Sequence, residues 1–103
     1  MSELKELLRH YTEGIYHPDV SGFEILELLD IRSEIARKET ELSLEERGKL
    51  ETADGVFLKN DAKLLTAISE ITDLAEMRER TSVPPSHWWW YLEKLAYAEK
   101  ITI

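Results

Sequence analysis

Helix-start signals occur twice in the first half of this sequence. The segments 21–24 and 43–46, Ser-Gly-Phe-Glu and Ser-Leu-Glu-Glu, each place a serine three residues before a glutamate. This is the capping box, in which each of the two side chains accepts a hydrogen bond from the backbone N–H of the other residue. The boxes predict helices from residue 21 to about 40 and from residue 44 onward. Because so few residues separate these helices, we expect an antiparallel helical hairpin.

The apolar residues before the first box also follow helical spacing. They predict a short amphipathic helix over 2–13, with Gly14 as its C-terminal stop. The expected apolar face comprises Leu4, Leu7, Leu8, Tyr11 and Ile15.

The helix from residue 21 to 40 changes character along its length. Apolar residues from Phe23 to Ile31 surround its first half, so we expect this half to be buried on several sides. The half that begins at Arg32 is mostly polar and is expected to face water.

A seam of apolar residues seven apart runs through the middle of the chain. It comprises Leu50, Phe57, Leu64 and Ile71. Because the seam keeps its phase, it predicts one helix over 44–79. At ~1.5 Å per residue such a helix would span roughly 54 Å, so a kink at 54–55 or 60–61 is the alternative. Gly48, Thr52 and Gly55 share one stripe of this helix. Its two glycines either allow another helix to approach closely or are tolerated in the helix without such a role.

Composition agrees with a helical fold. The 103 residues suffice for a single domain, 1–103, and include only four glycines and three prolines, too few for many tight turns. We therefore expect an all-α protein. Its architecture should be a small helical bundle built on the antiparallel hairpin, with a long third helix and a tryptophan-rich C-terminal helix.

Charge and cysteine content restrict the partners. The net charge of −8 repels the phosphates of nucleic acid and attracts a basic protein. There is no cysteine, which excludes disulfides and zinc–thiolate sites and fits a reducing compartment. No apolar run approaches the ~20 residues of a membrane span. We expect a cytoplasmic protein that binds neither nucleic acid nor membrane.

All three tryptophans stand in a row after two prolines. The segment 83–92 reads Val-Pro-Pro-Ser-His-Trp-Trp-Trp-Tyr-Leu, and its spacing predicts a helix from Pro85 to about Lys100. One face of that helix would anchor it to the core through Trp88, Trp89, Leu92 and Leu95. A second stripe would point away from the core and bind a partner through Trp90, Lys94, Tyr97 and Ile101.

Three interpretations of Trp90 stay open. It could belong to the core beneath another segment, to an interface with a protein partner or a second copy in a homodimer, or to a small-ligand pocket. Tryptophan and tyrosine are enriched at binding hot spots, and exposed apolar patches mark interfaces. The interface is therefore the working hypothesis.

Titratable residues give little sign of chemistry. Glu6, His10 and Glu13 share a helical face, but a metal site needs three or four convergent ligands and no second histidine-rich segment completes this one. His87 and Ser86 are adjacent on the expected helix and do not face each other, so we expect His87 to be a surface or rim residue. We predict no catalytic residue, no metal ligand and no cofactor.

The tail motif Pro-Pro-Ser-His-Trp-Trp-Trp-Tyr-Leu, together with Leu-Glu-Glu-Arg at 44–47 and Ala-Asp at 53–54, resembles a group of small bacterial helical proteins. The resemblance implies no activity, and a similarity in size and acidity to antitoxins is analogy alone. We expect a non-catalytic protein-interaction module, an antitoxin-like partner of a basic protein or a homo-oligomer. The alternative is a helical-bundle enzyme or ligand-binding protein with a pocket lined by residues 88–91 and His10, Tyr11 or His87.

Overall fold

Helices account for nearly all the secondary structure in the computed structural model, which describes residues 3–17 and 21–95. The elements are α1 (Glu3–Tyr16), α2 (Gly22–Arg37), the 3₁₀ helix η1 (Glu39–Glu41), α3 (Leu44–Lys59), α4 (Asp61–Ser69), α5 (Leu74–Arg80) and the 3₁₀ helix η2 (Trp88–Trp90). Residues 92–95 add one helical turn, and the described ranges contain no strand. The all-α prediction is confirmed. Within these ranges no helix is both long and apolar enough to cross a membrane.

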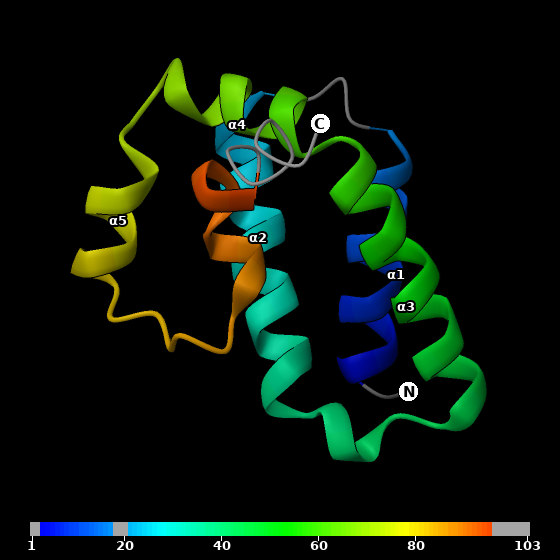
Figure 1. Cartoon of the computed structure of the whole chain (residues 1–103). Helices are drawn as coiled ribbons and strands as arrows, with labels where there is room; N and C mark the ends of the chain where they lie inside the picture. The colour runs from blue at the N-terminus through cyan, green and yellow to red at the C-terminus, as the bar shows by residue number, and fades with distance from the viewer. Residues whose placement is uncertain (1–2, 18–20, 96–103) are drawn as a thin grey trace.

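Helix α1 separates α2 and α3, the two helices of the predicted hairpin. Figure 1 shows α1 between these two helices, and α1 packs against both. Both helices begin at the predicted serines, but only Ser43 forms the complete capping box, whereas Ser21 makes one of the two predicted bonds. The Ser43 hydroxyl accepts from the Glu46 N–H at 3.1 Å and the Glu46 carboxylate accepts from the Ser43 N–H at 2.9 Å. The Ser21 hydroxyl accepts from the Glu24 N–H at 3.4 Å.

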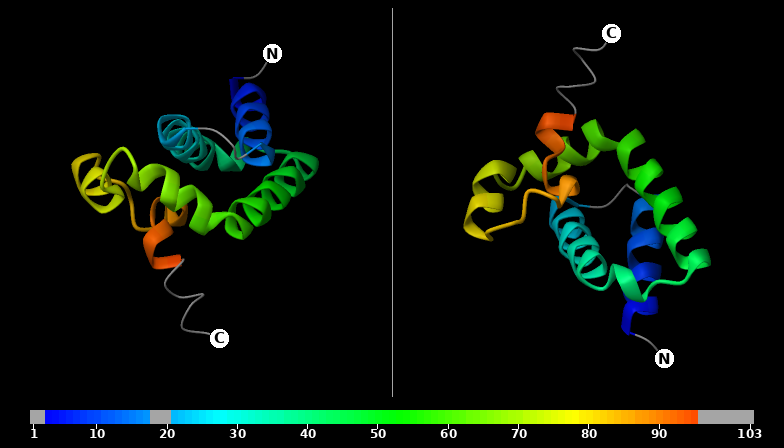
Figure 2. Two further views of the ribbon diagram at one scale, coloured as in Figure 1. Left: turned by 90° about the horizontal axis from the view of Figure 1, so that it is seen from above. Right: turned by 60° about the horizontal axis from the view of Figure 1, so that its bottom comes forward.

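The single helix predicted over 44–79 is wrong, because the chain breaks twice. At Asn60 the side chain donates to the carbonyl of Val56 at 2.9 Å, and this local bond competes with helix continuation. The second break follows Ser69, and Asp73 then starts α5 by accepting from the Glu76 N–H at 3.2 Å. The resulting bends let α3, α4 and α5 follow an arc (Figure 2).

A Schellman motif ends α5. The N–H groups of Ser82 and Val83 donate to the carbonyls of Glu79 and Arg78. This closure requires a left-handed residue, and Ser82 adopts φ 52° without being glycine. The chain thus turns sharply away from α5 toward the prolines.

Gly14 does not stop α1, which continues to Tyr16. A Cβ at this position would lie 2.6 Å from Cδ2 of Leu28. The glycine therefore lets α1 and α2 approach closely. Gly48 and Gly55 have open space instead, with no atom of the described residues within 4 Å of an added Cβ, so neither glycine serves a close helix approach there.

These contrasts predict opposite effects of alanine at three glycines. A Cβ on Gly22 would lie 2.3 Å from the carbonyl oxygen of Ala67 in α4, a backbone atom that cannot rotate away. Gly22→Ala should therefore lower the free energy of unfolding by about 1–3 kcal/mol. Gly48→Ala and Gly55→Ala should raise it by about 0.5–1 kcal/mol, because alanine favours an open helix position. Urea denaturation followed by circular dichroism would measure all three, and equal effects would contradict the packing of α2 on α4.

The core is continuous from α1 to the tryptophan segment. Its fully buried large side chains are Tyr11, Phe57, Ile15, Ile25, Leu29, Ile35, Leu64, Ile68 and Leu92. Two predictions about α2 are wrong. Phe23 is 69% exposed, because it lies in the first turn, at the end of the helix. Arg32 and Ser33 are buried, because the tryptophan segment covers the half of α2 that was expected to face water.

Candidate functional site

The three tryptophans do not lie on an α-helix. Residues 84–86 form a turn, His87 has φ −83° and ψ 73°, and Trp88–Trp90 form a single 3₁₀ turn. Successive residues of a 3₁₀ helix are ~120° apart, so the α-helical faces expected for this segment do not exist. The predicted helix therefore does not begin at Pro85; residues 92–95 are helical, and residues 96–100 lie outside the described part of the chain.

This backbone places the aromatic side chains differently from the prediction. Trp90 is 3% exposed, so the exposed interface predicted at this residue is wrong. Trp89 and Leu92 are buried, and Trp88 and Leu95 are partly buried against the same core. Lys94 is exposed. Tyr97 and Ile101, also predicted to bind the partner, lie outside the described residues.

Ser33 of α2 is the point to which the tryptophan segment binds. The indole Nε1–H groups of Trp89 and Trp90 both donate to its Oγ, at 3.0 and 3.1 Å. The same oxygen lies 2.9 Å from Nδ1 of His87. A hydroxyl has two lone pairs and one proton. The two indoles take the lone pairs, so the proton goes to Nδ1, and His87 is neutral with its own proton on Nε2. We call Ser33, His87, Trp89 and Trp90 the serine clasp.

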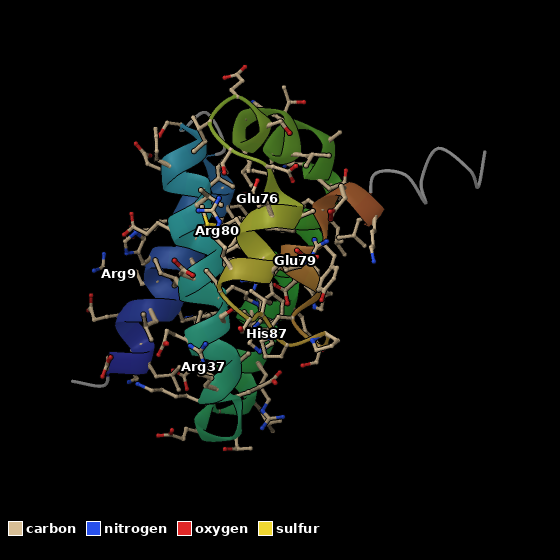
Figure 3. The ribbon with its side chains drawn as sticks, turned by 90° about the vertical axis from the view of Figure 1, so that its left-hand side faces the viewer. Arg9, Arg37, Glu76, Glu79, Arg80 and His87 are labelled. Carbon is tan, nitrogen blue, oxygen red and sulfur yellow. The ribbon has the colours of Figure 1, made fainter. Side chains whose placement is uncertain are left out.

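His87 is buried rather than on the surface or rim as predicted. Its ring stacks on Trp89, with centroids 4.7 Å apart and planes at 23°. Burial, followed by the positive charges of Arg37 and Arg32, lowers the pKa of His87 below its ordinary value. Figure 3 shows His87 and Arg37 on one side of the molecule, below α5. The surroundings thus favour the neutral ring that the clasp requires.

An ion pair between a buried arginine and a partly buried aspartate lies next to the clasp. Arg32, 5% exposed, donates from Nε and Nη2 to the two carboxylate oxygens of Asp54 in α3, each at 3.0 Å. The hydroxyl of Tyr11 in α1 donates to the same carboxylate at 2.7 Å, and burial raises the pKa of this phenol well above its ordinary range. The guanidinium also lies 4.2 Å from the ring centroid of Trp89. One arginine therefore joins α1, α2, α3 and the tryptophan segment.

The distance between Ser33 and His87 is that of a nucleophile and its base. The arrangement nevertheless does not suit nucleophilic catalysis. Both lone pairs of Ser33 already accept hydrogen bonds, and both residues are buried. The charged groups that act on His87 are arginines, which disfavour the imidazolium that a general base must become.

Of the three side chains proposed to complete a small-ligand pocket, His87 contacts the tryptophan segment, where it stacks on Trp89. Tyr11 is bound to Asp54 and His87 to Ser33, both inside the core. His10 is exposed and borders a separate hollow between α1 and α2, beside Gly14 and Leu28. The small-ligand pocket at residues 88–91 therefore stays a prediction, with Tyr11 and His87 both hydrogen-bonded inside the core.

The carboxylates of the conceivable metal half-site are held by an arginine. Arg9 pairs with Glu6 at 2.5 Å and with Glu13 at 3.5 Å. Over residues 3–17 and 21–95, no three histidine or acidic side chains are grouped so that they could hold a metal ion.

Large apolar side chains are exposed at one end of the bundle. There α1 and α3 end and α2 begins (Figure 1). Tyr16 is 47% exposed, Phe23 is 69% exposed and Leu58 is 39% exposed. We call these three residues the apolar end. Leu44, 89% exposed, lies at the opposite end, where α3 begins.

Neither the apolar end nor the serine clasp was predicted from the sequence. A signal for Ser33 existed, because it follows the buried residues Ile25 and Leu29 at steps of four. No local signal identified its partners. Comparisons with protein-family models, with curated proteins and with solved structures found no match, so the geometry above is the basis for a functional proposal.

Proposed function

We propose that this protein is a non-catalytic binding module whose apolar end is covered by a basic partner protein. The observation that carries the proposal is the exposure of Phe23, 69%, at the same end of the bundle as Tyr16 and Leu58. An aromatic side chain offers ~150–250 Å² of surface, so Phe23 and Tyr16 together present on the order of 200 Å². Aromatic residues of this kind dominate binding energy at interfaces.

Charge favours a basic partner over a second copy. Glu13, Glu24 and Glu27 are exposed on α1 and α2 near the apolar end. The whole chain carries −8, so two copies would repel each other, whereas a basic protein would be attracted. An antitoxin-like protein that neutralises a basic toxin in the cytoplasm is one version of this role. The earlier homodimer hypothesis becomes the competing outcome.

Substitution of Phe23 tests the proposal, with Leu44 as a matched control. Both residues stand in the first turn of a helix that a serine caps, and both are exposed. Phe23→Ala and Leu44→Ala should each change the free energy of unfolding by no more than about 0.5 kcal/mol. Phe23→Ala should weaken partner binding by roughly 30-fold, the ~2 kcal/mol of a hot spot, while Leu44→Ala leaves it unchanged.

The measurement has two stages. Light scattering first gives the mass of the pure protein. If the wild type is a dimer and Phe23→Ala is a monomer, the partner at the apolar end is a second copy of the chain and not a basic protein. Proteins captured from a lysate by the wild type, but not by Phe23→Ala, are then purified, and their affinities are measured by calorimetry at two salt concentrations. Equal affinity of the two variants, or a captured partner that is acidic, would refute the proposal.

A further inference from the structure

The serine clasp has no place in the binding role proposed above, yet it joins four polar groups inside the core. Two indole N–H groups and one imidazole of residues 83–95 meet the single hydroxyl of Ser33 on α2. From this geometry we propose that His87 is an acid-sensitive latch, whose protonation releases residues 83–95 from α2 and exposes Trp89 and Trp90.

Hydrogen-bond geometry makes the latch sensitive to a single proton. Neutral His87 accepts the Ser33 hydroxyl proton on Nδ1 at 2.9 Å. A protonated imidazole has N–H groups on both nitrogens and no lone pair. Nδ1–H would then face an oxygen whose two lone pairs already accept from Trp89 and Trp90. At least one buried donor would lose its partner, which destabilises the docked segment.

The charges around His87 act in the same direction. The groups that lower its pKa are Arg37 and Arg32, both on α2. Each arginine has its own carboxylate, Asp54 of α3 for Arg32 and Glu34 of α2 for Arg37.

Helix α5, the other element near His87, does not reverse this excess of positive charge. On the same side of the molecule α5 carries Glu76, Glu79 and Arg80 (Figure 3), and Arg80 pairs with Glu76 at 2.7 Å. An imidazolium at position 87 would therefore add a positive charge beside the two arginines of α2.

The direction of the pH effect follows from the lowered pKa. Burial and the arginines hold the pKa of folded His87 below 6.5, its ordinary value in the released chain. The clasp is therefore fully formed above about pH 6.5 and is lost as the pH falls through the lower folded value. Released residues stay attached to α5, because Arg78 donates to the carbonyl of Trp90 at 2.8 Å and pairs with Glu93 at 2.8 Å.

Tryptophan fluorescence tests the latch directly, because all three tryptophans of the chain lie at 88–90. Acrylamide quenching of the wild type should rise roughly twofold between about pH 7.5 and about pH 5.5, the range in which histidine titrates. Far-ultraviolet circular dichroism should stay constant over this range. His87→Asn retains an acceptor for Ser33 and does not titrate, so its quenching should not change with pH. The exposed histidines give matched controls, His10→Asn and His17→Asn, which should behave as the wild type.

Nitrogen NMR of the wild type supplies a readout that does not depend on a variant folding. At about pH 7.5 the His87 ring should be neutral with its proton on Nε2. The latch is overturned if Nδ1 carries the proton instead, or if quenching in the wild type does not change with pH. It is also overturned if the change persists in His87→Asn, or if the helical signal falls together with the fluorescence change, since that would be unfolding of the whole domain.

Discussion

Asp54→Ala is expected to lower the free energy of unfolding by about 3–5 kcal/mol. The substitution leaves the buried guanidinium of Arg32 without its counter-ion and the Tyr11 hydroxyl without its acceptor. Removing one partner of a buried ion pair has a cost of this size because the remaining charge stays desolvated. Urea denaturation of the purified protein, followed by circular dichroism, measures the loss.

Two further variants define what the Asp54 result means. Glu51→Ala removes an exposed carboxylate from the same helix and should change the stability by no more than about 0.5 kcal/mol. The double substitution Arg32→Met, Asp54→Leu removes both charges and should recover the part of the loss that comes from the unpaired guanidinium, while the Tyr11 hydroxyl still lacks its acceptor. If Asp54→Ala were as stable as Glu51→Ala, Arg32 would not be buried against α3 as described.

Trp90→Ala should lower the free energy of unfolding by a similar amount, about 3–5 kcal/mol, since it empties a fully covered aromatic site. Trp90→Phe should cost less, because it keeps a buried aromatic ring, although it loses part of the indole volume and the N–H bond to Ser33. Lys94→Ala, at an exposed position in the same segment, should be neutral. Thermal unfolding of protein shown to be monomeric separates these cases. A Trp90→Ala variant as stable as Lys94→Ala would restore the exposed placement that the sequence predicted.

Helix starts were predictable because capping is a local interaction. Ser21 and Ser43 find their hydrogen-bond partners three residues away, so the sequence near each serine is sufficient. The breaks at Asn60 and Asp73 are also local, but the seven-residue seam outweighed them in the prediction. Leu50, Phe57 and Leu64 are all buried even though Asn60 interrupts the helix between them. A regular seven-residue spacing of apolar residues thus indicates which residues are buried, but it does not prove that the helix is continuous.

The site was less predictable because its contacts are not local. The faces predicted for Trp88–Trp90 assumed an α-helix. They are wrong because these residues form a single 3₁₀ turn after the turn at Pro84-Pro85. Polarity alone assigned Arg32 and Ser33 to the surface. Their partners stand 22 residues away in the case of Asp54, and 54 to 57 residues away in the serine clasp. No pattern within one helix encodes these pairings.

The sequence separation in the serine clasp also bears on the order of folding. Forming a contact between residues 54–57 positions apart has a larger entropic cost of loop closure than forming a capping bond between residues three positions apart. We expect the helix starts to form early, whereas the indole hydrogen bonds to Ser33 form near the end of folding. The same bonds should then open at lower free energy than the α1–α2 core. Exchange of the Trp89 and Trp90 indole protons with deuterium should therefore be faster than exchange of the backbone amides of Leu29 and Ile35, which makes the aromatic run the most easily opened part of the core.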